Sequence, residues 1–159
     1  MEILPITAVE NILSFGISPG LNVMWGCPGD SVKSLDDIVD FLIEYDNQGQ
    51  LRTVRPVTPY PGCSLYHMAI SQGKLEGPSD FFDRFRNPER MTVNFTDLSE
   101  KDYYDALLSA NKRLIDNYYE KTKGDKKECD DVKDGFKKLY FPTCDEDFDM
   151  PDPRHYETE

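Results

Sequence analysis

The sequence predicts an α/β fold that contains one unit of strand, helix and parallel strand. Residues 21–25 (Leu-Asn-Val-Met-Trp) form a short apolar run between turn residues, which is typical of a buried strand. An amphipathic helical pattern follows at residues 34–46, and a second β-prone run spans residues 51–57. Such a unit takes about 35 residues, and a crossover helix of this kind joins parallel strands.

The helix predicted in this unit has one apolar side and one acidic side. We expect Ser34 to be its N-cap and the turn at residues 46–49 to end it. The apolar residues recur at helical spacing, at Leu35, Ile38, Val39, Leu42 and Ile43. The acidic residues fall between them, at Asp36, Asp37, Asp40 and Glu44. The apolar side should therefore pack against the strands.

Further helices are predicted on both sides of this unit. Thr7 and Glu10 fit a capping box that opens a first helix, and Gly16 is expected to end it. Downstream of the second strand, residues 64–72 and 79–85 have the pattern of two short helices. The strand, helix and strand unit is thus expected to lie among helices.

The C-terminal half is predicted to contain one long helix. Residues 91–96 are β-prone or extended, and Ser99 is expected to open a helix that ends near Tyr119. The Lys- and Asp-rich stretch at 121–138 favours a weak helix or a linker. Beyond Pro142 we expect disorder, because the sequence there is acidic and offers few apolar residues to bury.

The net charge of the 159-residue chain is −12, and half of it lies at the C-terminal end. Residues 145–159 contain seven acidic residues and one basic residue, which gives −6. Phosphate binding needs clustered Lys and Arg, so we do not expect a nucleic-acid partner. There is no run of about 18 apolar residues, so we expect no membrane association. Because the N-terminal residues do not form a secretory signal, we expect a cytoplasmic location.

Two loops follow the predicted strands, and both are candidate binding loops. Residues 26–30 (Gly-Cys-Pro-Gly-Asp) follow the first strand, and residues 58–63 (Thr-Pro-Tyr-Pro-Gly-Cys) follow the second. Ligands of α/β folds bind at the carboxyl ends of neighbouring parallel strands, and Asp30 can accept hydrogen bonds from a ligand. An ordinary turn and a rigid connector fit the same local patterns, so the loops taken separately leave both interpretations open.

Several short motifs occur in a fixed order after the first loop and its helix. They are Val-Arg-Pro-Val-Thr-Pro-Tyr-Pro-Gly at 54–62, Leu-Tyr at 65–66, Ala-Ile at 69–70, Gly-Lys-Leu at 73–75, Asp-Phe-Phe at 80–82 and Thr-Val-Asn-Phe-Thr-Asp-Leu-Ser at 92–99. With these motifs in this order and spacing, residues 5–119 resemble the C-terminal end of a radical SAM enzyme. The type most similar carries an N-terminal cobalamin-binding domain.

The resemblance implies a C-terminal fragment of a partial, TIM-like (β/α)6 barrel with two parallel strands, followed by a helical extension. Residues 1–75 would be the last strand and helix units of the barrel, and residues 76–120 the helical extension. Residues 121–159 would be a charged linker and a disordered acidic tail. In that family the barrel binds S-adenosylmethionine and a [4Fe–4S] cluster, and reductive cleavage of S-adenosylmethionine yields a 5′-deoxyadenosyl radical.

The same resemblance implies a set of binding residues in the two loops. The first loop ends the family's fifth strand and the second ends its sixth, near the adenosine and methionine parts of the cofactor. The residues that would border S-adenosylmethionine are Gly26, Pro28, Gly29 and Asp30, with the backbone of Val57 and Pro59 near the adenine.

The sequence departs from the family at its reactive centre. The family's cluster needs a CxxxCxxC loop, and the four cysteines of this chain (Cys27, Cys63, Cys129 and Cys144) do not form one. The [4Fe–4S] cluster and the cobalamin are therefore expected of the family but not of this chain. We do not expect radical chemistry from this chain alone, and its S-adenosylmethionine pocket would need a partner chain to be complete.

Two interpretations follow from this departure. In the first, the chain is a truncated or split radical SAM-like protein, which associates with an N-terminal radical SAM half or with itself through a free strand edge. In the second, it is a small non-catalytic protein-interaction module derived from that fold. Its acidic tail and the aromatic face of the long helix (Tyr103, Tyr104, Tyr118 and Tyr119) would then contact a protein partner.

Overall fold

The computed structural model describes residues 3–142, which form a mixed α/β fold that is mostly helical. The elements in chain order are α1 (Ile3–Ser14), β1 (Met24–Trp25), α2 (Val32–Tyr45), β2 (Arg55–Pro56), α3 (Ser64–Ser71), α4 (Pro78–Arg84), α5 (Glu100–Thr122) and α6 (Lys126–Tyr140). None of the helices within this part of the chain is long and apolar enough to cross a membrane.

The two strands pair in parallel, as predicted, but each is only two residues long. Met24 is opposite Arg55, and Trp25 is opposite Pro56. The predicted strands at 21–25 and 51–57 are longer because an apolar pattern marks residues that are buried, whereas a strand also requires a partner for its backbone. Helix α2 connects the two strands, so the predicted unit of strand, helix and parallel strand is confirmed.

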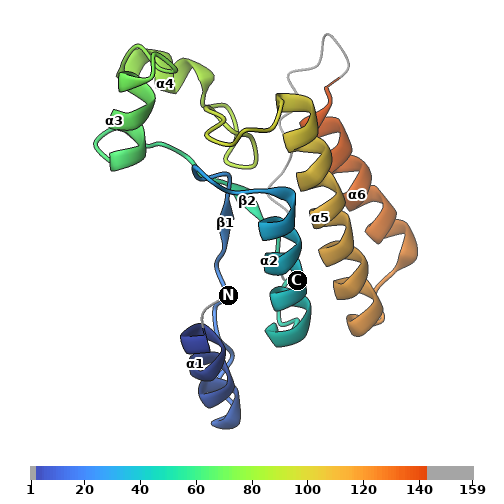
Figure 1. The fold of residues 1–159 in the computed structure, drawn as a ribbon. Coiled ribbons are helices and arrows are strands. Elements are labelled where there is room, and N and C mark those ends of the chain that lie inside the picture. The colour runs from blue at the N-terminus through green and yellow to red at the C-terminus, as the bar shows by residue number, and fades with distance from the viewer. Residues whose placement is uncertain (1–2, 143–159) are drawn as a thin grey trace.

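The main hydrophobic core lies between the strands and three helices. Helix α5 packs against α2 on one side and against α6 on the other, and all three stand beside the small sheet (Figure 1). The side chains buried most deeply in this core include Trp25, Leu35, Val39, Val54, Tyr103, Leu107 and Phe136. The core therefore joins the strands and α2 to the two C-terminal helices of the described sequence.

A second, smaller core lies under α3 and α4, beyond the ends of the strands (Figure 1). Its buried members are Val57, Tyr66, Ala69, Leu75, Phe81, Val93 and Phe95. The stretch at 91–96, predicted to be β-prone or extended, forms no strand but contributes the side chains of Val93 and Phe95 to this core. The half-buried side chains of Cys27 and Cys63 pack against it, so both candidate loops rest on this second core.

Helix α2 begins three residues earlier than predicted. Its N-cap is Ser31, whose side chain accepts a hydrogen bond from the backbone N–H of Ser34. Ser34 is the third helical residue and completes a capping box by bonding back to the N–H of Ser31. Either serine has a side chain that can cap a helix. The hydroxyl of Ser34 contacts Trp25 and Asp30, and these contacts hold Ser34 within the first turn. The prediction of Ser34 as N-cap is therefore wrong, although the buried stripe of Leu35, Val39 and Leu42 is confirmed.

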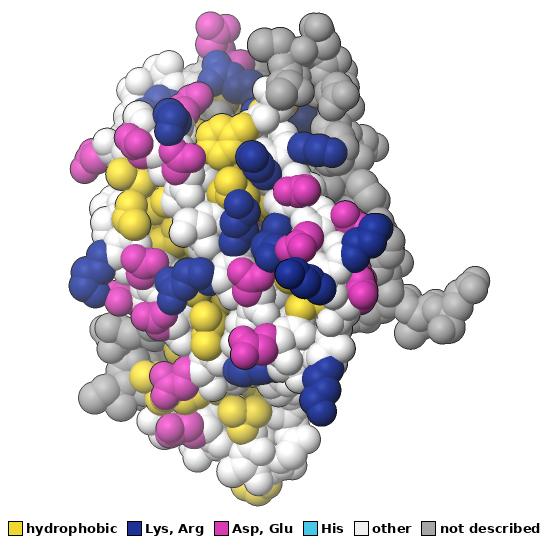
Figure 2. Space-filling model, turned by 90° about the vertical axis from the view of Figure 1, so that its right-hand side faces the viewer, with side chains coloured by type: hydrophobic (Ala, Val, Ile, Leu, Met, Phe, Trp, Pro, Cys, Tyr) yellow, Lys and Arg dark blue, Asp and Glu magenta, His cyan; other side chains and the backbone are white. Residues whose placement is uncertain are grey.

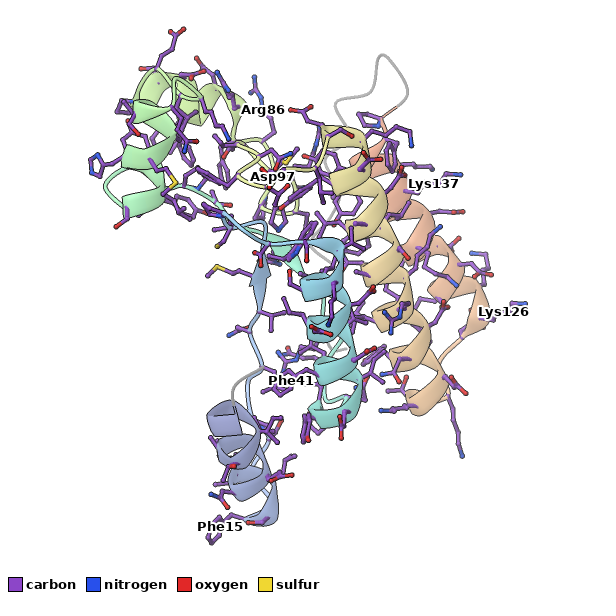
Figure 3. The ribbon with its side chains drawn as sticks, in the orientation of Figure 1. Phe15, Phe41, Arg86, Asp97, Lys126 and Lys137 are labelled. Atoms are coloured by element: carbon purple, nitrogen blue, oxygen red, sulfur yellow. The ribbon has the colours of Figure 1, made fainter. Side chains whose placement is uncertain are left out.

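Helix α1 also begins earlier than predicted. It starts at Ile3, so Thr7 lies inside the helix and is not its N-cap. Pro5 does not prevent this start, because the first turn of a helix needs no backbone N–H donors. Gly16 follows the end of the helix in a left-handed conformation (φ 71°), as expected for a terminator. Phe15 is 81% exposed and lies at the far end of the molecule from α3 and α4 (Figure 3).

The predicted long helix is confirmed as α5, and its N-cap is Ser99 as expected. Two possibilities were predicted for residues 121–138, a weak helix or a linker, and the structure has a helix there. Residues 126–140 form α6, a regular helix with Asp125 as N-cap, within the charged linker and tail predicted for residues 121–159. The acidic end of that range, from residue 143, lies outside the described residues.

Helix α6 is stabilised by burial of one side and not by its composition. Its buried residues recur at helical spacing in a mostly charged sequence: Cys129, Phe136, Leu139 and Tyr140. Packing of such a stripe supplies most of the stability of a helix in a protein. The charged residues of α6 include both Lys and Asp or Glu, and the face of the molecule seen in Figure 2 carries basic and acidic side chains intermixed.

Candidate functional site

The two candidate loops begin side by side at one end of the sheet. Because β1 and β2 are parallel, both loops leave the carboxyl ends of their strands at the same edge. The backbone N–H of Val57 donates to the carbonyl of Trp25 at 2.8 Å, which joins the start of one loop to the start of the other. The predicted neighbourhood of the loops is therefore present.

The carboxylate of Asp30 organises the first loop from within. Its Oδ2 accepts hydrogen bonds from the backbone N–H groups of Gly26 (3.0 Å) and Cys27 (2.9 Å). Its Oδ1 accepts one from the Ser34 hydroxyl at 3.1 Å. A carboxylate has about four lone-pair sites, so three internal bonds leave room for one further donor. Asp30 is thus chiefly a structural residue of the loop.

The backbone conformation and the close packing at position 26 both require glycine. The φ angle of Gly26 is 105°, which residues with a side chain rarely adopt. A Cβ atom built on Gly26 would overlap the hydroxyl of Tyr103, which comes from α5. Gly29 also has a positive φ of 87°, but a Cβ there would meet nothing within 4 Å. A side chain at position 26 would therefore clash with α5 as well as strain the backbone, whereas a side chain at position 29 would only strain the backbone.

Trp25 forms the base of the first loop and is fully buried, which confirms its expected place in the core. Its Nε1 donates to the carbonyl of Ser31 (3.1 Å) and to the hydroxyl of Ser34 (3.2 Å). The ring of Tyr103 stacks on it, with 4.5 Å between ring centroids and 28° between planes. Stacked aromatic pairs at this distance add stability beyond their buried area.

The six predicted binding residues differ in their exposure. Pro28 and Gly29 are exposed at the tip of the first loop, and Asp30 is half-buried. Gly26 is buried under the loop, Val57 is 5% exposed, and Pro59 is fully buried. The structure thus brings all six to the same end of the sheet, but the surface that they present comes mainly from the tip of the first loop.

The second loop is anchored by its own turn and by an aromatic cluster. Gly62 has a positive φ of 97°, and Cys63 caps α3 by accepting a hydrogen bond at Sγ from the N–H of Tyr66. Tyr60 is 51% exposed, and its ring contacts those of Phe81 and Phe85. The second loop therefore exposes a tyrosine ring, a feature that the sequence pattern did not single out.

Two titratable side chains at the first loop, those of Cys27 and Tyr103, have raised pKa values that favour their neutral forms. Burial, and next the charge of Asp30, raise the pKa of the Cys27 thiol. Burial likewise raises the pKa of Tyr103 well above its usual value. A protonated thiol is a poor nucleophile, so this loop is better suited to binding than to covalent chemistry.

Among residues 3–142, no three His, Cys, Asp or Glu side chains are grouped so as to hold a metal ion. His67 lies exposed on α3, and His155 is outside the described residues. The region thus consists of two loops, with mainly backbone groups at their surface, beside the buried and stacked rings of Trp25 and Tyr103.

Comparisons of this chain with protein-family models, with curated proteins and with solved structures found no match. The resemblance to radical SAM enzymes accordingly remains a prediction from the motifs at residues 26–99. The function of the loops has to be argued from their own geometry.

Tyr103 is the residue at this site that sequence analysis missed. The second interpretation assigned the tyrosines of the long helix to contacts with a protein partner, but Tyr103 and Tyr104 are buried in the core, so they are not available for that role. The helical pattern gave Tyr103 no link to the loops. The only signal in the sequence was Gly26 itself, since a glycine after a buried strand often marks a close approach. The pattern could not show which residue makes that approach.

Proposed function

We propose that this chain supplies part of an S-adenosylmethionine pocket, completed by a second polypeptide segment, in a fragment of a (β/α)6 barrel. The observation that carries the proposal is the hydrogen bond from the N–H of Val57 to the carbonyl of Trp25, which brings the two family-like loops to one edge of parallel strands. In the family that the sequence resembles, these are the loops beside the cofactor. The proposal is that the chain binds and orients the cofactor and does not perform the reaction alone.

The exposed groups of the loops fit this role in part. Pro28 and Gly29 offer an apolar and backbone surface, and Tyr60 offers an exposed ring on which a base can stack. Asp30 keeps one acceptor site for a ligand hydroxyl or amine. Such contacts on one side of a ligand give weak binding, and millimolar affinity corresponds to only about 4 kcal/mol.

The test is a titration of the ¹⁵N-labelled chain with S-adenosylmethionine, followed by amide chemical shifts. We expect shifts at millimolar ligand that are confined to residues 26–30 and 57–63. Separate titrations with adenosine and with methionine then show which part of the ligand each loop contacts. Shifts that are absent, or that lie only on α5 and α6, would overturn the proposal.

A pair of variants tests whether the loop tip makes the contact. Gly29→Leu places a side chain at the tip and should abolish the ligand-induced shifts. Gly73→Leu is the matched control, because Gly73 also has a positive φ and open space around a built Cβ but lies at the end of α3. If both variants reduce binding equally, the effect is a general loss of stability and not a contact at the tip.

A second candidate function is binding of another polypeptide at the open edge of β1. Trp25 directs its carbonyl toward β2, so Met24 directs its backbone groups to the opposite edge, and its side chain is 67% exposed. Among the described residues, β1 pairs only with β2. An unpaired edge can accept an added strand, either from a second copy or from a separate N-terminal half.

Sedimentation of the isolated chain tests this second function. A dimer that Met24→Pro converts to a monomer would support pairing at β1, because proline removes the edge N–H donor. A monomer that captures no peptide of β-strand sequence in a titration would count against it. Met24→Ala is the control, because it changes the same side chain but keeps the backbone N–H at the edge.

A further inference from the structure

The carbonyl of Trp25 accepts two hydrogen bonds from opposite parts of the chain. One comes from the N–H of Val57, just before the second loop, at 2.8 Å, and the other from the hydroxyl of Tyr103 on α5, at 3.2 Å. This carbonyl belongs to the same peptide group as the N–H of Gly26, which donates to Asp30. The peptide plane at the start of the first loop is therefore held at both its oxygen and its nitrogen.

The hydroxyl of Tyr103 is itself held in place. Its ring is 1% exposed, stacks on Trp25 and meets the ring of Tyr104 edge-on. Because Gly26 has no Cβ, the hydroxyl occupies the space where that atom would lie. The O–H of Tyr103 is protonated and able to donate near neutral pH, since its pKa lies above the ordinary value of 10.0. The hydrogen bond to Trp25 is thus built from two residues 78 positions apart.

We propose that Tyr103 is a positioning residue for the first loop. Its O–H orients the peptide between Trp25 and Gly26, and this orientation directs the exposed tip at Pro28 and Gly29. Helix α5, through the hydroxyl of Tyr103, thereby controls the orientation in which the first loop meets a ligand. The part of the inference that concerns ligand affinity rests on the proposed function, whereas the part that concerns loop geometry stands without it.

The experiment compares two single-atom deletions on the same helix. Tyr103→Phe removes the hydroxyl that reaches Trp25 and keeps the stacked ring. Tyr104→Phe is the matched control, since its buried hydroxyl accepts from the N–H of Met91, away from the loop. Amide hydrogen exchange is measured at Gly26 and Cys27 in the full chain without ligand, and S-adenosylmethionine is then titrated into each variant.

We expect Tyr103→Phe to speed exchange at Gly26 and Cys27 about five-fold, as follows from loss of one ordinary hydrogen bond. Its affinity for S-adenosylmethionine should fall by a similar factor, and Tyr104→Phe should change neither quantity. Equal exchange at these amides in the two variants would overturn the inference. If the unmodified chain shows no ligand-induced shifts, the proposed function fails, and the exchange data still decide the role of Tyr103.

A second variant approaches the same contact from the loop, in case Tyr103→Phe does not fold. Gly26→Ala displaces the hydroxyl by occupying its space, so it should also speed exchange at Cys27 and weaken the ligand-induced shifts. Gly29→Ala, which has a similar φ and no neighbour, should leave exchange at Cys27 closer to that of the unmodified chain. The same exchange rate in both alanine variants would contradict a positioning role for the Tyr103 hydroxyl.

Discussion

The side-chain amide of Asn111 forms two hydrogen bonds with the backbone of Val54. Its Oδ1 accepts from the N–H of Val54 at 2.8 Å, and its Nδ2 donates to the carbonyl of Val54 at 3.2 Å. The same Nδ2 donates to the hydroxyl of Tyr140 at 2.9 Å, and Asn111 is fully buried. A neighbouring strand would bond to Val54 in the same way. Asn111 therefore satisfies the backbone groups of Val54, just before β2, in place of a neighbouring strand. It also links this segment to α5, which carries Asn111, and to α6, which carries Tyr140.

Replacing Asn111 should cost much more than replacing another asparagine of α5. Asn111→Ala leaves the N–H and C=O of Val54 buried without their partner, and each such group costs about 1–3 kcal/mol. We expect the free energy of unfolding to fall by about 3 kcal/mol in urea denaturation. Asn117→Ala, at a half-buried position of the same helix, is the control and should lie within about 1 kcal/mol of the parent. A similar loss in both variants would show that the bonds to Val54 contribute little.

Helix α6 should be an integral part of the fold. Phe136 is fully buried in the main core, so Phe136→Ala removes a large side chain and leaves a cavity. We expect a loss of about 3–5 kcal/mol, measured by chemical denaturation with circular dichroism. Lys137→Ala changes the exposed neighbour and should have little effect. If Phe136→Ala unfolds at the same denaturant concentration as Lys137→Ala, α6 does not share the core in solution.

The two glycines of the first loop should respond differently to alanine. Gly29→Ala adds only the strain of a left-handed backbone, about 1–2 kcal/mol. Gly26→Ala adds the same kind of strain and also an overlap with the Tyr103 hydroxyl, so its loss of stability should exceed that of Gly29→Ala. Combining Gly26→Ala with Tyr103→Phe should recover part of the difference in a double-mutant cycle. Additive losses in the cycle would show that the overlap is relieved elsewhere.

The stability of this protein should fall at alkaline pH. Burial raises the pKa of Tyr103, Tyr104 and Tyr140 above the ordinary value of 10.0. Above pH 10 the unfolded chain loses these protons while the folded chain keeps them, so unfolding releases protons and becomes more favourable as pH rises. The stabilisation is complete below pH 10 and is lost as the pH climbs toward the raised folded values.

Each tyrosine contributes at most about 1.4 kcal/mol per pH unit to this slope. Denaturation curves recorded between pH 8 and pH 11 should therefore show that the free energy of unfolding falls steeply above pH 10. Tyr103→Phe should reduce the slope of this fall by up to about 1.4 kcal/mol per pH unit, the contribution of one proton. A variant that declines as steeply as the parent would show that Tyr103 ionises normally in the folded protein.

Much of the local structure could be predicted from short patterns. The apolar stripe of α2 and the N-cap Ser99 of α5 are signals carried by neighbouring residues, and both are confirmed. The start of α1 was misplaced because a capping-box pattern at Thr7 also occurs within a helix. The loops at the strand ends were found in the right place, but their closeness to α5 was not.

The sequence by itself determined that a helix joins two parallel strands and that two glycine-containing loops follow them. These features depend on periodicity and turn chemistry within a few residues. The tertiary structure alone decided that α6 is a packed helix, that Asn111 closes the edge at Val54, and that Tyr103 reaches the peptide before Gly26. These contacts join residues 57 and 78 positions apart, and no local pattern specifies which distant side chain fills a given space in a packed core.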